Sequence, residues 1–199
     1  MIVVVFHSIL GVRSGEIGIA RYLAGCGHET LIVDRYDGQS FDGYETAEEY
    51  ARALGSRKLR LRATEAVADL RERYVVAGFS TGGEMAIEVA ASHSAFCGLL
   101  LYAGAGDTEM MGIETWPKTV SVQVHYTLAD PTRNYEWIDR FASVVRAADA
   151  AYELVEYPGS GHLFTDCALP SEYQPDDARN VWANSARFIG GLSVAPRSV

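Results

Sequence analysis

The stretch YVVAGFSTGGEMA, residues 74–86, runs a β-branched segment into GFSTGG and then continues with helix-forming residues. Glycine loses more backbone freedom on folding than any other residue, so three glycines around one serine are costly in a regular element. They fit a sharp turn in which a strand and a helix cross too closely for Cβ atoms at Gly78 and Gly82. The chain is thus limited to folds in which a strand passes directly into a helix, with Ser80 between them.

Strand-like and helix-like segments alternate along the whole chain. Short apolar, β-branched runs predict six strands, at residues 2–6, 30–33, 74–77, 98–102, 119–125 and 152–157. Helical patterning predicts helices at residues 15–26, 46–72 with a break at Gly55, 83–92, 134–149 and 177–190. This order predicts an α/β protein whose mainly parallel sheet of about six strands has helices on both faces. We expect a single domain over residues 1–192 and a loose tail over residues 193–199.

The charge balance excludes nucleic acid as a partner. The 199 residues include 17 Lys and Arg against 26 Asp and Glu, a formal net charge of −9. Binding to phosphates needs clustered cations. The basic cluster at residues 57–62 alternates with apolar residues, which is typical of a solvated helix face or strand edge.

The sequence predicts a cytoplasmic protein. The apolar N-terminus MIVVVFHSIL has no basic segment before it and no cleavage site after it, so we expect a strand and not a signal peptide. No stretch approaches the roughly 20 apolar residues of a membrane span. Cys26, Cys97 and Cys167 are odd in number and lack CxxC or zinc spacing, which indicates three thiols in a reducing compartment.

Ser80 is the candidate nucleophile. It lies in Gly78-x-Ser80-x-Gly82 between a strand and a helix, which is the context of a nucleophile elbow. Such a serine is held at a strained backbone conformation so that its Oγ projects above the sheet. The N–H of Thr81, at the start of the helix, can then donate to an oxyanion. The alternative is a glycine-rich turn with an N-capping serine.

His162 is the candidate base, because a serine hydroxyl is a poor nucleophile near neutral pH without one. It follows the last predicted strand and comes after Ser80 in sequence, as the Ser-Asp-His order of this architecture requires. His28 and His93 fall at the opposite end of the sheet, and His125 falls within or at the end of a strand.

Two acids compete to orient the imidazole. Asp130 follows the fifth predicted strand in HYTLADP, and Asp107 follows the fourth in AGAGD. We favour Asp130 because its loop is short and well anchored, and the acid must be rigidly placed. Asp107 stays open as the alternative.

The segments GFSTGG, HYTLADP and YPGSGHLF together resemble the three active-site blocks of the dienelactone hydrolase family, which has the α/β-hydrolase fold. VVVFHSILG and DRYDG resemble two further segments of that family, so the resemblance extends from residue 1 to about 190. The resemblance implies an oxyanion hole made by the backbone N–H groups of Ile9 and Thr81.

The departures from the family are informative. Well-known members use a cysteine with a glutamate, whereas this chain has Ser80 and Ser8 at those positions, which is similar to the serine esterases of the family. The expected positive residue after the histidine is absent, and we expect Asp166 there to repel an anionic lactone. The usual first two N-terminal strands are also missing, so we expect a partner subunit, as in a homodimer, to cover the exposed sheet edge.

The sequence therefore predicts a serine hydrolase that cleaves a small ester or thioester without a cofactor. Tyr36, Phe79 and Phe164 are the predicted substrate contacts, and residues 37–56 and 164–176 the predicted rims of an open site. One alternative is a small-molecule-binding protein that retains the fold without catalysis. Another is a metal hydrolase using His125, Asp130 and His162, although no metal-ligand spacing supports it.

Overall fold

The computed structural model describes residues 1–71, 73–92 and 95–194. The strands are β1 (Ile2–Phe6), β2 (Glu29–Val33), β3 (Tyr74–Phe79), β4 (Phe96–Tyr102), β5 (Ser121–Thr127) and β6 (Tyr152–Tyr157). The helices are α1 (Ser14–Gly25), α2 (Tyr44–Leu54), α3 (Ser56–Val67), α4 (Thr81–Ser92), α5 (Tyr135–Ala147) and α6 (Pro175–Val194).

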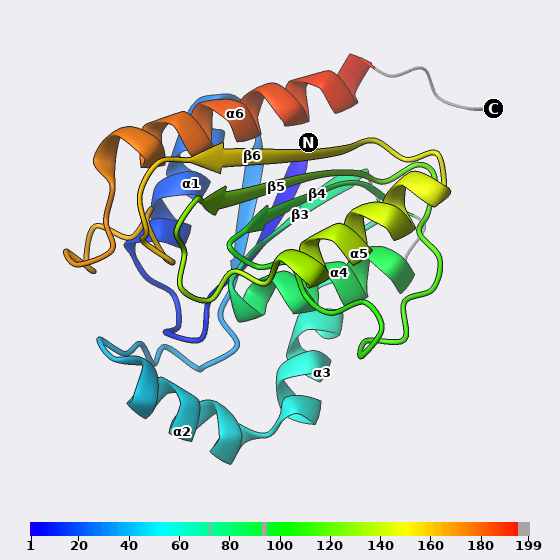
Figure 1. The fold of residues 1–199 in the computed structure, drawn as a ribbon. Helices are drawn as coiled ribbons and strands as arrows, with labels where there is room; N and C mark the ends of the chain where they lie inside the picture. The colour runs from blue at the N-terminus through cyan, green and yellow to red at the C-terminus, as the bar shows by residue number, and fades with distance from the viewer. Residues whose placement is uncertain (72, 93–94, 195–199) are drawn as a thin grey trace.

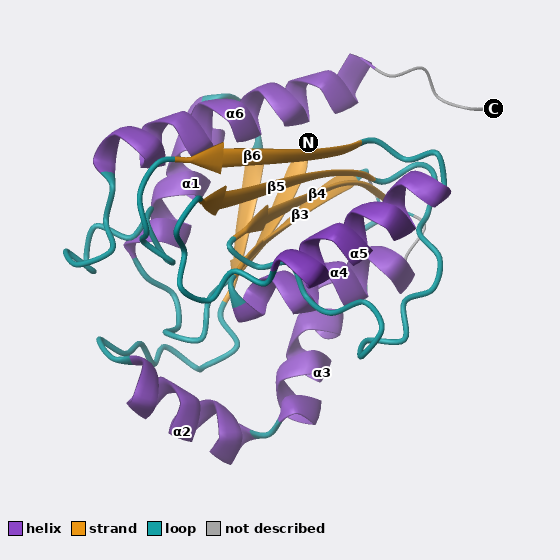
Figure 2. Cartoon of the chain, viewed as in Figure 1, coloured by secondary structure: helices purple, strands orange, loops and turns teal. Residues whose placement is uncertain are grey.

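The six strands form one sheet in the order β2-β1-β3-β4-β5-β6, and every neighbouring pair is parallel. Helices cover both faces, with α1 and α6 on one side and α3, α4 and α5 on the other (Figures 1 and 2). Helix α2 lies beyond the sheet, below the ends of the strands in Figure 1. The predicted α/β fold and six-stranded parallel sheet are confirmed.

The β-branched strands are apolar throughout because the sheet is buried on both faces. In β1, Val3 and Val5 pack toward α1 and α6, whereas Val4 and Phe6 pack toward α3, α4 and α5. These four side chains and all of β3 are buried. A hydrophobic core therefore lies on each side of the central strands.

The predicted helix boundaries need small corrections. Gly55 adopts a φ of 82° and separates α2 from α3, as the sequence predicted. The last helix runs to Val194, so residues 193 and 194 are helical and not part of a loose tail. The rest of the predicted tail, residues 195–199, lies outside the described residues, as does His93. All three cysteines are free thiols, and none of the helices in the described ranges is both long and apolar enough to cross a membrane.

The strand order places the candidate site. After β1, the chain first adds β2 on one side and then β3 on the other, so the order reverses beside β1. Ligands of open α/β sheets bind in the crevice outside the carboxyl ends of the strands at such a reversal. Ile9 follows β1 and Ser80 follows β3, and both segments therefore meet at this crevice.

Candidate active site

Ser80 occupies a strained turn between β3 and α4. Its φ is 49°, in the left-handed region that few residues other than glycine adopt. Its own N–H donates to Tyr102 O at 2.9 Å, and its carbonyl accepts from Gly83 N–H at 2.7 Å. The last residue of β4 and the first turn of α4 thus hold the turn from both sides. They keep Ser80 in a backbone conformation that costs about 1–3 kcal/mol.

The glycines of GFSTGG are required by close backbone approaches. A Cβ at Gly78 would collide with Gly82 O, and a Cβ at Gly83 would collide with Gly104 O. At Gly82 a Cβ would lie 2.5 Å from the carbonyl oxygens of both Phe6 and His7. The helix start therefore packs directly against the backbone of the β1 and β4 ends, as the sequence predicted for Gly78 and Gly82.

We expect Gly82→Ala to destabilise the protein by about 1–3 kcal/mol or more, because both colliding atoms belong to backbone and cannot rotate away. The matched control is Gly190→Ala in α6, where a Cβ meets nothing within 4 Å. There the higher helix propensity of alanine should stabilise the protein by about 0.5–1 kcal/mol. Urea unfolding measures both. Equal effects of the two substitutions would contradict the packing argument.

His162 lies between Ser80 and Asp130. The Ser80 hydroxyl lies 2.8 Å from His162 Nε2, and His162 Nδ1 lies 2.9 Å from Asp130 Oδ2. A carboxylate only accepts, so it places the proton on Nδ1 and leaves Nε2 to accept from the serine hydroxyl. The loops that carry the two residues are also joined directly, since Thr127 Oγ1 donates to Gly161 O at 2.9 Å and Ala129 N–H to Gly159 O at 2.9 Å.

Thr132, a residue not predicted from the sequence, holds the Asp130 carboxylate in place. Its N–H and its hydroxyl donate to Asp130 Oδ1 at 2.8 and 2.9 Å, and its Oγ1 lies 2.7 Å from His162 Nδ1. Burial acts to raise the pKa of Asp130, but the hydrogen bonds from His162 and Thr132 outweigh it, and the pKa lies below its ordinary value. The signal was the D-x-T spacing, typical of a side chain that bonds its own backbone two residues on.

Asp107, the competing acid, lies in a different ion pair. Its Oδ1 accepts from Arg140 Nη1 at 2.6 Å and from Glu109 N–H at 3.0 Å. Burial acts to raise the pKa of Asp107, but the hydrogen bond from Arg140 and those from the N–H groups of Glu109 and Met110 outweigh it, and the pKa lies below its ordinary value. Of the two acids, the structure brings only Asp130 to His162 within the described residues.

The N–H groups of Ile9 and Thr81 are both free of acceptors within the described part of the chain, and both residues line the pocket that contains Ser80. The neighbouring N–H groups are occupied: Ser8 N–H donates to Glu16 at 3.0 Å, and Leu10 N–H to Ser8 Oγ at 3.3 Å. Glu16 also accepts from Arg13 N–H at 3.1 Å, so one buried carboxylate holds both ends of the loop after β1.

Asp166 does not face the site, which corrects the predicted repulsion of an anionic lactone. Its side chain is buried and pairs with Arg13, with Nε and Oδ2 2.5 Å apart, and it also accepts from the Ser14 hydroxyl. Arg13 further donates to Ala168 O at 3.0 Å. The negative charge is therefore neutralised inside the protein, where it ties the loop after β1 to the loop after β6.

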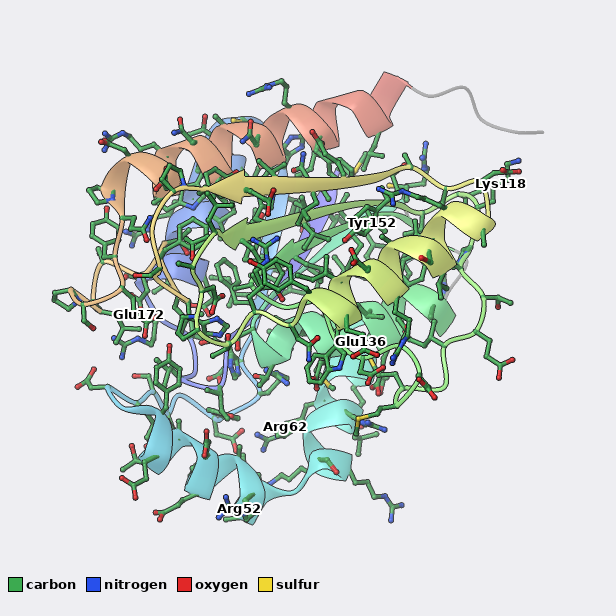
Figure 3. All side chains as sticks on the ribbon, in the orientation of Figure 1. Arg52, Arg62, Lys118, Glu136, Tyr152 and Glu172 are labelled. Atoms are coloured by element: carbon green, nitrogen blue, oxygen red, sulfur yellow. The ribbon has the colours of Figure 1, made fainter. Side chains whose placement is uncertain are left out.

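Tyr44 and Glu172 form a second connection that the sequence analysis missed. The Tyr44 hydroxyl donates to Glu172 Oε1 at 2.8 Å, and the other carboxylate oxygen accepts from Leu163 N–H at 2.6 Å. Figure 3 labels Glu172 on the loop between β6 and α6. The Tyr44 and His162 ring centroids are 6.4 Å apart. Helix α2 is thereby attached to the residue that follows His162, and no local sequence pattern indicates this.

Ser80 and His162 line a pocket of about 220 Å³. The three aromatic residues predicted to contact substrate, Tyr36, Phe79 and Phe164, do not line it. Phe79 packs against Tyr102 with ring centroids 4.4 Å apart, and Phe164 is buried in the core formed with α1 and α6. Tyr36 is buried and lines an adjoining pocket of about 170 Å³, which shares Ile9, Thr81 and Glu84 with the first. The predictions for Phe79 and Phe164 are wrong, because both rings are packed in the core, Phe79 from the end of β3 and Phe164 from the loop after β6.

Of the two segments predicted to form the rims of the site, only residues 37–56 line the pocket. Helix α2, within residues 37–56, contributes Tyr44 and Glu48 to the pocket, whereas residues 164–176 contribute none of its lining. Thr132 and Trp137, from the loop after β5 and the start of α5, complete it instead.

His125 lies away from this pocket. It is fully buried, its Nδ1 and Nε2 contact Tyr157 and Gln123 at 2.8 and 3.0 Å, and burial lowers its pKa to about 3. Its ring stacks against Tyr102 and Tyr157. The alternative with His125, Asp130 and His162 as joint metal ligands is therefore wrong. The described ranges contain no group of three His, Cys, Asp or Glu side chains arranged to hold a metal.

The chain was compared with models of known protein families. The family model of the dienelactone hydrolase family matches residues 1–193. The chain belongs to this family. The resemblance predicted from the sequence is confirmed, and membership of the dienelactone hydrolase family also confirms the prediction of a carboxylic ester hydrolase.

Solved structures of similar fold include further members of the dienelactone hydrolase family and esterases. A dienelactone hydrolase-like promiscuous phosphotriesterase from metagenomic libraries is 22% identical, covers 96% of this chain and 86% of its own, and has a TM-score of 0.81. An esterase from Pyrobaculum calidifontis is 18% identical, with coverage of 98% and 77% and a TM-score of 0.67. Esterase 2 from Thermogutta terrifontis, phosphorylated by paraoxon, is 18% identical, with coverage of 98% and 84% and a TM-score of 0.61. A comparison with curated protein sequences found no match.

Proposed function

We propose that this protein is a serine hydrolase that cleaves a small ester or thioester through an acyl-enzyme, with Ser80, His162 and Asp130 as its catalytic triad. The observation that carries the proposal is the position of His162, 2.8 Å from the serine hydroxyl and 2.9 Å from the carboxylate. These distances are within the range that general-base catalysis requires.

In the first half-reaction, Ser80 Oγ attacks the carbonyl carbon while His162 Nε2 takes the hydroxyl proton. The tetrahedral intermediate then collapses, the bond to the leaving alcohol or thiol breaks, and His162 returns the proton to the leaving group. In the second half-reaction a water molecule gives its proton to His162 and attacks the acyl-enzyme. Ser80 leaves with that proton, and the carboxylic acid is released.

Asp130 and the two backbone donors stabilise charge during both steps. The Asp130 carboxylate, whose pKa is held below its ordinary value, offsets the positive charge on the imidazolium. The N–H groups of Ile9 and Thr81 donate to the oxyanion, and they are available because they have no acceptor among the described residues. Loss of one such donor typically costs a factor of about 10²–10³ in kcat.

Two of the related structures have names that describe reactions with organophosphorus esters, which supports a reactive nucleophile in this pocket. One is a promiscuous phosphotriesterase, and another is phosphorylated by paraoxon. A nucleophilic serine activated by a histidine attacks phosphorus as it attacks a carbonyl carbon, whereas an N-capping serine does not.

The test is intact-mass analysis after treatment with a fluorophosphonate, together with hydrolysis of short p-nitrophenyl esters. We expect one adduct per chain, mapped to Ser80 by peptide analysis, and turnover that a chelator leaves unchanged. The absence of both an adduct and turnover would refute the proposal and favour the non-catalytic binding protein. The cytoplasmic location and the homodimer stay predictions.

A further inference from the structure

We infer that the ester or thioester carries a positively charged group, which binds between Glu48 of α2 and Glu84 of α4 in the Ser80 pocket. This inference rests on the proposed function, because it concerns the substrate of the same pocket. The ligand class is a quaternary or protonated amine linked to the scissile ester.

The charge of the pocket wall is negative. Among the described residues, Glu48 and Glu84 line the pocket together with His162, and no lysine or arginine lines it. The two carboxylates come from different helices and belong to a chain whose formal net charge is −9. A cleft lined by one sign of charge attracts ligands of the opposite sign and repels ligands of the same sign.

Neither carboxylate is in an ion pair with a described residue. Glu48 and Glu84 have no hydrogen-bond or ion-pair partner among the described residues. Arg60 on the adjoining helix pairs with Glu88 at 2.9 Å, and Arg60 and Arg35 line the neighbouring pocket together with Glu84 without an ion pair to it. Asp166, by contrast, is fully paired with Arg13 inside the protein. The pocket therefore keeps two charges that a ligand can pair with, while the acidic residue next to the histidine loop is compensated.

The rest of the wall suits a cation as well. Tyr44 and Trp137 are half-buried aromatic side chains in the lining. Aromatic faces attract ammonium groups, and quaternary ammonium ligands are recognised in this way. An anionic group would meet neither a cation nor an arginine fork here.

The location of Glu84 links binding to catalysis. It lies in the first turn of α4, whose first N–H, from Thr81, is the proposed oxyanion donor. A carboxylate at this position opposes the negative charge that develops on the oxyanion. A cation bound beside Glu84 offsets that effect, so a charged substrate gains in the transition state as well as on binding.

The experiment compares matched esters that differ only in charge. One series is the p-nitrophenyl ester of γ-trimethylammoniobutyric acid, its uncharged tert-butyl isostere and p-nitrophenyl hydrogen glutarate. The other series compares acetylcholine with its tert-butyl isostere. In acetylcholine the cation is in the leaving group, and hydrolysis of both esters is measured by proton release. We expect kcat/KM to be about tenfold higher for the cation in at least one series, with the advantage decreasing as salt is added.

The variants Glu48→Gln and Glu84→Gln, and the two combined, should bring the ratio of cationic to neutral kcat/KM toward one. Both kcat/KM values of the ratio are measured on the same sample of a variant, so a smaller fraction of folded enzyme lowers both equally and leaves the ratio unchanged. Glu49→Gln removes the same charge from the same helix at an exposed position outside the pocket and should keep the wild-type ratio.

The outcomes separate the two proposals. Turnover of the neutral esters without any charge preference, or the same ratio in the double variant as in wild type, would refute the cationic substrate and leave the serine hydrolase intact. Preference for the glutarate ester would refute it as well. No turnover of any ester, with no fluorophosphonate adduct, would refute the serine hydrolase itself and the substrate with it.

Discussion

Replacing Ser80 with alanine should lower kcat for p-nitrophenyl esters by about 10⁶-fold and abolish the fluorophosphonate adduct. The triad members act as a unit, so loss of the nucleophile removes nearly all of the rate that the triad provides. The fold should persist, because the turn is held by Tyr102 O and Gly83 N–H through the backbone of residue 80. We expect the free energy of unfolding to change by about 1 kcal/mol at most, since one hydrogen bond to His162 is lost.

Ser160→Ala is the matched control for this substitution. Ser160 is also flanked by two glycines, lies two residues before His162 and is exposed. Its replacement should leave both turnover and labelling as in wild type. If Ser80→Ala kept its turnover while Ser160→Ala lost it, the nucleophile would be misassigned.

Asp130→Asn should lower kcat by about 10⁴-fold with the fold intact. An asparagine amide can stabilise the wrong tautomer of His162, in which Nε2 carries the proton and can no longer accept one from Ser80. Thr132 donates to Asp130 Oδ1 from its N–H and hydroxyl, and the same oxygen of an asparagine can accept both bonds. Ester hydrolysis measures the loss, and circular dichroism verifies the fold.

Asp107→Asn makes the same chemical change at the competing acid. Asp107 pairs with Arg140 and not with His162, so we expect wild-type kcat and a lower Tm. Asp130→Asn should therefore lower kcat with the fold intact, whereas Asp107→Asn should lower Tm with kcat unchanged. A loss of about 10⁴ in kcat for Asp107→Asn alone would overturn the assignment of Asp130.

The strands and helices could be predicted from the sequence because their signals are local. The continuous β-branched runs of residues 2–6 and 74–77 match β1 and β3, and Gly55 separates α2 from α3 as expected. Burial on both faces requires apolar residues at consecutive positions, and this pattern is visible without knowledge of the partner strands. Helix ends were less certain, as the extension of α6 to Val194 shows.

The candidate site could also be located from the sequence, because a parallel sheet brings the carboxyl ends of its strands to one edge. Ser80, Asp130 and His162 each follow a strand, so this rule predicts them at one edge of the sheet, and the order in the chain and the short loop of Asp130 favoured them over other candidates. The aromatic predictions failed for the opposite reason. A ring at the end of a strand or in the loop after it can face the pocket or the core, and the local sequence does not distinguish the two. Phe79 and Phe164 face the core.

The sequence by itself thus determined the α/β fold, the strained serine turn with its glycines and the order of the three candidate catalytic residues. Only the tertiary structure decided which charges face the pocket. Arg13 and Asp166 are 153 positions apart in sequence, and Tyr44 and Glu172 are 128 apart. The pairing with Arg13 neutralises Asp166, whereas Glu48 and Glu84 line the pocket. The physical reason is that an ion pair depends on the distance between two side chains in space, which is set by the packing of separate loops and not by either local segment.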